Sequence, residues 1–120
     1  MDRSQSTIEI GIIGGGITGV ALARGLSQCT HLTVTLFESA SELGEVGAGV
    51  SFGANAVRAI QGLGMNAAYE KIADRTPSPW ENVWFEWRKG ENADFLSSSL
   101  APSVGQSSVH RADFLNLLAK

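Results

Sequence analysis

The sequence has little of what several kinds of site require. It holds one cysteine, Cys29, in 120 residues, which excludes an intramolecular disulfide and a cysteine cage for a metal. Its two histidines, His31 and His110, stand far apart without acidic neighbours at ligand spacing, and we expect no metal site. Lys and Arg number 9 against 12 Asp and Glu and form no cluster, so we expect no binding of nucleic acid, which needs a basic face.

Long hydrophobic runs are missing as well. No apolar stretch approaches the roughly 20 residues that cross a bilayer, and the polar segment 1–7 lacks the apolar centre of a signal peptide. We therefore expect no stable membrane insertion and a reducing, cytoplasmic location. A hydrophobic fraction of 43% with 18% charged residues is typical of a folded globular chain.

Hydrophobic periodicity predicts a strand, a helix and a second strand at the start of the chain. Residues 8–13 form a short β-branched run that ends in glycines, residues 17–27 have helical spacing, and residues 32–37 form a second apolar run. Strand, helix and strand within about 30 residues is the size of one βαβ unit, whose two strands are parallel. The predicted fold class is α/β, with a Rossmann-like unit.

The remaining residues predict loops, helices and a small antiparallel β extension. Composition and periodicity indicate a loop at 39–53, helices at 54–63, 66–72 and 112–118, strands at 83–88 and 93–96, and a connector at 97–108. Trp80, Trp84 and Trp87 are predicted to pack in the sheet or core, as alternating aromatic residues more often do, rather than to stack on a substrate. Because only two strands read as parallel, we expect residues 1–120 to be the front part of a larger protein.

Three glycines and one acidic residue in the βαβ unit carry the chemistry. Gly14 lies where the first strand turns into the helix, Gly16 removes a Cβ from the path of a pyrophosphate, and Gly19 lets the helix pack close to the strands. The helix N-terminus then offers free N–H groups and its positive dipole end to phosphates. Glu38, nineteen residues after Gly19, ends the second strand and is placed to bind ribose hydroxyls while repelling a 2′-phosphate.

Two alternatives remain open at this point. The glycines and Glu38 could be an ordinary turn and a solvated acid, and the same unit binds either FAD or NAD. The glycine-rich stretch 42–51 is suited to lie along an extended ligand such as FAD, although a flexible surface loop has the same composition.

Five segments occur in a specific order: Ile12–Gly19, Leu36–Glu38, Glu45–Val50, Asn55–Arg58 and His110–Phe114. With them, nearly the whole chain resembles the N-terminal part of the single-component, FAD-dependent aromatic hydroxylases, particularly the salicylate hydroxylase-like group and its fungal relatives in polyketide tailoring. The resemblance implies that Gly14, Gly16 and Gly19 hold the FAD pyrophosphate and that Glu38 binds the adenosine ribose.

The resemblance also implies roles for four residues later in the chain. Ala48, Gly49 and Ser51 would lie against the flavin half of FAD, and Arg111 would reach the phosphate or ribityl region with a permanent positive charge. Without the resemblance, Arg111 is equally well read as a helix-start residue paired with a carboxylate in solvent.

The implied activity is hydroxylation of a phenolic aromatic substrate with NAD(P)H and O2. No catalytic residue is identified in the chain, and the later Gly-Asp segment and most of the substrate pocket of such enzymes are expected beyond residue 120. We therefore expect the 120 residues to be inactive alone. The alternatives are another FAD- or NAD-dependent oxidoreductase and a non-catalytic remnant.

Overall fold

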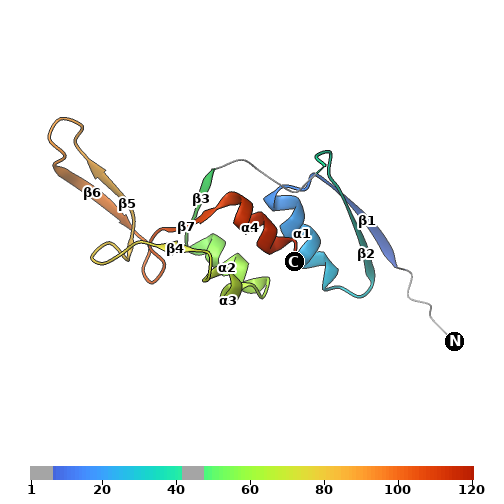
Figure 1. The fold of residues 1–120 in the computed structure, drawn as a ribbon. Helices are drawn as coiled ribbons and strands as arrows, with labels where there is room; N and C mark the ends of the chain where they lie inside the picture. Colours follow the sequence, from blue (N-terminus) through green and yellow to red (C-terminus); the bar gives the residue numbers. More distant parts are fainter. Residues whose placement is uncertain (1–6, 42–47) are drawn as a thin grey trace. The chain divides into compact units, whose positions relative to one another are not determined.

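The computed structural model describes residues 7–41 and 48–120 (Figure 1). The chain forms two compact units. The first unit comprises residues 1–47 and 112–120, and the second comprises residues 48–111. Part of the predicted loop, residues 42–47, lies outside the described residues. No helix in the described ranges is long and apolar enough to cross a membrane.

The first unit contains the predicted βαβ motif. Its elements are β1 (Ile8–Ile13), α1 (Ile17–Ser27) and β2 (Leu32–Phe37). The two strands are parallel, with Ile8 opposite Leu32 at the start of the register, and α1 packs against both of them. Ile12 of β1 and Val20 of α1 are buried where helix and sheet meet. The predicted α/β class and Rossmann-like unit are therefore confirmed.

The second unit is mainly antiparallel. Its elements are β3 (Gly49–Phe52), α2 (Ala54–Gly62), α3 (Asn66–Tyr69), β4 (Asp74–Arg75), β5 (Val83–Arg88), β6 (Phe95–Leu100) and β7 (Ser107–His110). One sheet has the order β3-β7-β4, and β5 and β6 form a separate hairpin. The helix α4 (Arg111–Leu118) begins at the last residue of this unit and continues in the first, and its predicted apolar residues Phe114, Leu115 and Leu118 are buried.

Two predictions for the second unit were wrong. The expected loop at 39–53 contains the strand β3, and the expected connector at 97–108 contains most of β6 and the start of β7. β6 and β7 are rich in Ser, a composition that resembles a loop. The pairing of β3 with β7 joins segments more than 50 residues apart, because Ser51 lies opposite Ser108. Tertiary pairing therefore overrides a weak local strand preference here.

The tryptophans only partly follow the packing prediction. Trp84 is half-buried, makes an edge-to-face contact with Phe85 at a centroid distance of 5.0 Å, and lies beside Gly53. Trp80, however, is 46% exposed and lies outside the strands, so the prediction was wrong for this residue. Trp87 is 51% exposed, but it lies in β5 and its ring is 6.3 Å from that of Phe85, so it packs in the sheet and not in the core. Trp87 belongs to the two-stranded sheet β5-β6, and such a small sheet cannot bury both of its faces by itself.

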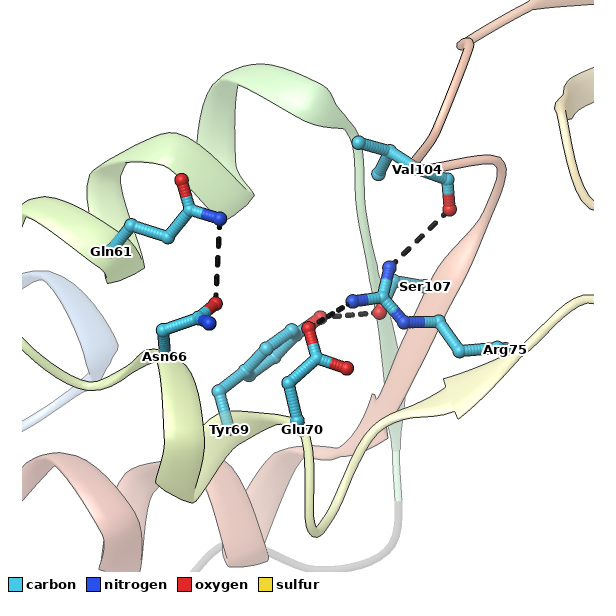
Figure 2. A network of polar contacts seen from close by, with 7 residues as sticks. All are labelled: Gln61, Asn66, Tyr69, Glu70, Arg75, Val104 and Ser107. Atoms are coloured by element: carbon cyan, nitrogen blue, oxygen red, sulfur yellow. Dashed lines mark hydrogen bonds and ion pairs between the residues drawn. The ribbon is translucent and has the colours of Figure 1, made fainter.

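A buried hydroxyl pair holds the three-stranded sheet to α3 (Figure 2). The Tyr69 and Ser107 side-chain oxygens are 2.6 Å apart, and both residues are fully buried. The Tyr69 ring also packs against Phe52 of β3 at a centroid distance of 6.0 Å. Beside this pair, Arg75 bonds both the Glu70 carboxylate and the Val104 carbonyl oxygen. The central strand β7 is thus fixed by a side chain that comes from a different element.

We expect Tyr69→Phe to lower the free energy of unfolding by about 1–3 kcal/mol, because the buried Ser107 hydroxyl would lose its partner. Urea unfolding of Tyr69→Phe, Ser107→Ala and the double variant measures this. The double variant should lose less than the sum of the two single losses. Strictly additive losses would contradict a bond between the two hydroxyls.

Candidate functional site

The turn between β1 and α1 is fastened to the end of β2. Gly14 has a φ of +104°, a conformation that favours glycine, and its N–H donates to the Phe37 carbonyl oxygen at 2.7 Å. The next N–H, that of Gly15, donates to Oε2 of Glu38 at 2.5 Å. Because β1 and β2 are parallel, their carboxyl ends lie at one edge, and this brings the turn and Glu38 together.

Gly19 is required by a close approach of backbone to backbone. A Cβ at this position would lie 1.9 Å from the Gly14 carbonyl oxygen and 3.1 Å from its carbon. Neither backbone atom can move without shifting the strand or the helix, so no other residue fits. This contact supports the packing role predicted for Gly19.

Gly16 differs from Gly19, because the space at its Cα is open. A Cβ at Gly16 would meet no atom of the described residues within 4 Å, and its φ of −70° suits any residue. Gly16 is the N-cap of α1, and the first intrahelical bond runs from Val20 N–H to the Gly16 carbonyl oxygen at 3.0 Å. The N–H groups before Val20 therefore precede the helix hydrogen bonds, and the first turn of α1 has no acidic residue. Such a helix end is suited to bind an anion.

The exposed carboxylate of Glu38 already has several donors within the chain. Besides Gly15 N–H, it accepts the Ala40 N–H at 2.8 Å and the Ser39 hydroxyl at 3.2 Å, both on Oε1. These bonds, the one from Ala40 first, lower the pKa of the Glu38 carboxyl below its usual value. Glu38 is therefore a stable anion at neutral pH.

The other predicted residues come together on β3 and β7 of the second unit. Arg111 N–H donates to the Ala48 carbonyl oxygen at 3.0 Å, and Gly49 pairs with His110, so Arg111 directly follows the end of this ladder. The hydroxyl of Ser51 is 3.0 Å from that of Ser108 and accepts a bond from the Gln106 amide at 3.2 Å. The predicted site residues thus form two groups, one in each unit.

Ser108 and Gln106 were missed by the sequence analysis. Both lie in the segment that was expected to be a connector, and each bonds to Ser51 across the sheet. The only local signal was the alternation of Ser107 and Val109, which face one side, with Ser108 and His110.

The described hollows of the first unit lie away from the predicted residues. One, of about 350 Å³, is lined by α1, β2 and the end of α4, including Arg24, Ser27 and Leu118; Arg24 donates to the Leu118 carbonyl oxygen at 3.3 Å. Another, of about 240 Å³, is lined by Thr33, Thr35 and their neighbours on the strands. The candidate site in this unit consists of a backbone turn and a carboxylate.

Comparison with known proteins finds close relatives for nearly the whole chain. A family model for an NAD(P)-binding Rossmann-like domain matches residues 12–61. A salicylate hydroxylase of Pseudomonas putida is 60% identical over 118 residues, which are 98% of this chain and 27% of that enzyme. Over nearly its whole length, the chain is similar to salicylate hydroxylases and other FAD-dependent monooxygenases. It spans about a quarter of the length of these curated relatives.

One further relative and one solved structure are also similar to this salicylate hydroxylase-like chain. A 6-methylsalicylate 1-monooxygenase of Aspergillus terreus is 40% identical, over 97% of the chain and 27% of that protein. A solved salicylate hydroxylase in complex with its substrate has a TM-score of 0.84 and 50% identity, and the match covers 97% of the chain and 26% of that structure. The predicted resemblance is therefore confirmed.

We expect Gly19→Ala and Gly16→Ala to separate folding from binding in the salicylate hydroxylase-like chain. Gly19→Ala should destabilise the first unit by several kcal/mol, on the order of 3, because its Cβ overlaps the Gly14 carbonyl oxygen. Gly16→Ala should leave thermal unfolding almost unchanged and weaken FAD binding, because its methyl group lies in the open space above the helix end. Thermal unfolding followed by circular dichroism and FAD titration followed by flavin fluorescence measure the two effects. Equal stability losses in both variants would contradict this assignment.

Proposed function

We propose that residues 1–120 form the N-terminal part of the FAD-binding domain of an aromatic hydroxylase that uses NAD(P)H and O2. The observation that carries the proposal is the β1–α1 turn, in which Gly19 permits the close packing of α1 and Gly16 leaves the helix end open. An open helix end with unbonded N–H groups fits a pyrophosphate. The similarity to salicylate hydroxylase over 98% of the chain supports the same assignment.

In this proposal the first unit holds the adenosine side of FAD. Gly14, Gly16 and Gly19 form the pyrophosphate turn, and Glu38 accepts a hydrogen bond from the adenosine ribose. Glu38 is exposed and its pKa is lowered, so it is ionised and can accept from a ribose hydroxyl, and its negative charge opposes a 2′-phosphate at this position.

The second group of residues holds the flavin half in the same proposal. Ala48 directly precedes β3, and Gly49 and Ser51 are exposed on the same face of that strand, where Ser51 offers a hydroxyl. Arg111 is joined to Ala48 through its backbone N–H and supplies the positive charge for a phosphate or ribityl oxygen.

The substrate proposed is a phenolic aromatic molecule, by similarity to relatives named for salicylate and 6-methylsalicylate. FAD, when bound, would supply the redox chemistry of a reaction in which NAD(P)H is the reductant, one oxygen atom of O2 enters the aromatic ring and the other leaves as water. The described residues of this chain bind and orient the cofactor, and none of them is assigned as a catalytic acid or base.

A second candidate is a nicotinamide dinucleotide at the same turn. It is favoured by one observation, the match of residues 12–61 to an NAD(P)-binding Rossmann-like domain. A competition experiment distinguishes the two candidate ligands. When FAD and NAD are present at equal concentration, only the preferred one should displace the other from the chain.

A chimaera tests the proposed function directly. The matching N-terminal segment of the Pseudomonas putida salicylate hydroxylase is replaced with these 120 residues, to which 118 of its residues align. We expect the purified chimaera to contain FAD and to oxidise NADH or NADPH faster when salicylate is added. Gly16→Ala in the same chimaera should reduce the FAD content. A folded chimaera without FAD would contradict the proposal, and one with FAD but no response to salicylate would show that these 120 residues do not support the hydroxylase reaction.

A further inference from the structure

The carboxylate of Glu38 is bonded to the glycine turn in the chain without any ligand. We propose that Glu38 is a positioning residue for the phosphate-binding turn, which it holds in a binding-ready shape through the Gly15 N–H. The inference rests on the proposed function only in taking this turn as the phosphate site. It goes beyond the ribose contact, because it makes Glu38 contribute to the binding of ligands that have no ribose.

The geometry of the carboxylate supports this role. Oε2 accepts the N–H of Gly15, a buried residue 23 positions earlier in the chain, at 2.5 Å. Oε1 accepts the N–H of Ala40 at 2.8 Å and the Ser39 hydroxyl at 3.2 Å. One side chain therefore joins the β1–α1 turn to the segment that follows β2.

The bond from Gly15 N–H to Glu38 acts together with the bond from the preceding N–H, that of Gly14. Gly14 N–H donates to the Phe37 carbonyl oxygen at 2.7 Å, so two successive peptide groups of the turn are tied to the end of β2. Both N–H groups are directed to the protein, and the donors left for a phosphate are those from Gly16 to Gly19, before the first bond of the helix. Fixing the Gly15 peptide fixes the start of α1, which follows it directly.

A carboxylate is the side chain that this arrangement requires. Each of its oxygens meets a backbone N–H, so an amide in its place would direct its NH2 group at one of two donors. A carboxylate accepts about four hydrogen bonds, and the chain uses three. The carboxylate is also exposed, so Glu38 can hold the turn while a ribose hydroxyl reaches it. Aspartate keeps the charge but is one methylene too short to bond both Gly15 and Ala40.

The first test needs no ligand. Amide hydrogen exchange is measured by NMR on the ¹⁵N-labelled 120-residue chain, unsubstituted and as Glu38→Asp, with Glu9→Asp as a control on an exposed carboxylate of β1. We expect the Gly15 amide to exchange about tenfold faster in Glu38→Asp only, the loss of one charge-assisted bond, while Ile12 of β1 stays protected. Unchanged exchange at Gly15 would overturn the inference.

A measurement on the unsubstituted chain guards against a variant that fails to fold. A scalar coupling across the hydrogen bond, between the Gly15 nitrogen and the Glu38 carboxyl carbon, should be present in the absence of ligand. If that coupling is absent while the one from Ala40 is observed, the inference is overturned.

The second test uses inorganic pyrophosphate, which has no ribose, and follows the amide shifts of Ile17 and Thr18. Glu38→Asp should bind pyrophosphate severalfold more weakly than the unsubstituted chain and Glu9→Asp, although its charge is unchanged, because binding must then order the turn. ADP, which carries a ribose, is titrated in parallel. If Glu38→Asp binds pyrophosphate with unchanged affinity and only its affinity for ADP falls, Glu38 is a ribose ligand alone, and this inference is overturned while the proposed function stands. If neither pyrophosphate nor FAD moves any amide of the turn, the proposed function falls as well.

Discussion

The close approach of α1 to β1 at Gly14 and Gly19 is the constraint on which the first unit depends. The two backbones are separated by less than a methyl group would need, and this distance sets the helix axis against the strand pair. With α1 placed there, its N-terminus lies at the carboxyl edge of both strands. The residues that follow each strand, the glycines after β1 and Glu38 after β2, are then brought to one place by the parallel pairing.

The same constraint explains why the first unit could be predicted from sequence residue by residue. A short β-branched strand, a glycine turn and a small-residue helix are local patterns, and one spacing rule links them to Glu38. The second unit depends on pairing between distant segments of weak local preference. Ser107 is the central example, because its burial depends on Tyr69, 38 residues away, and nothing near Ser107 in the sequence indicates it.

The candidate site was also predicted unevenly. The glycines and Glu38 follow from the motif, and Ala48, Gly49, Ser51 and Arg111 were found only through the family resemblance. The bond from Gly15 to Glu38 was not predicted, because the motif assigns the acidic residue a contact with the bound ribose and says nothing of its hydrogen bonds within the protein. Likewise, the exposure of Trp80 and Trp87 could not be read from alternation, which gives the faces of a strand but not what covers them.

The buried hydroxyl of Tyr69 has an optical consequence. Tyr69 is the single tyrosine of the sequence, and burial raises the pKa of its phenol above the usual 10.0. The ultraviolet absorbance change of tyrosinate formation in alkali therefore comes from one group, inside the second unit. While that unit is folded, the change occurs at higher pH than for a free phenol, and at a pH between the unfolded and the folded pKa unfolding releases the proton. The chain thus carries its own spectroscopic reporter for β7, without any label or cofactor.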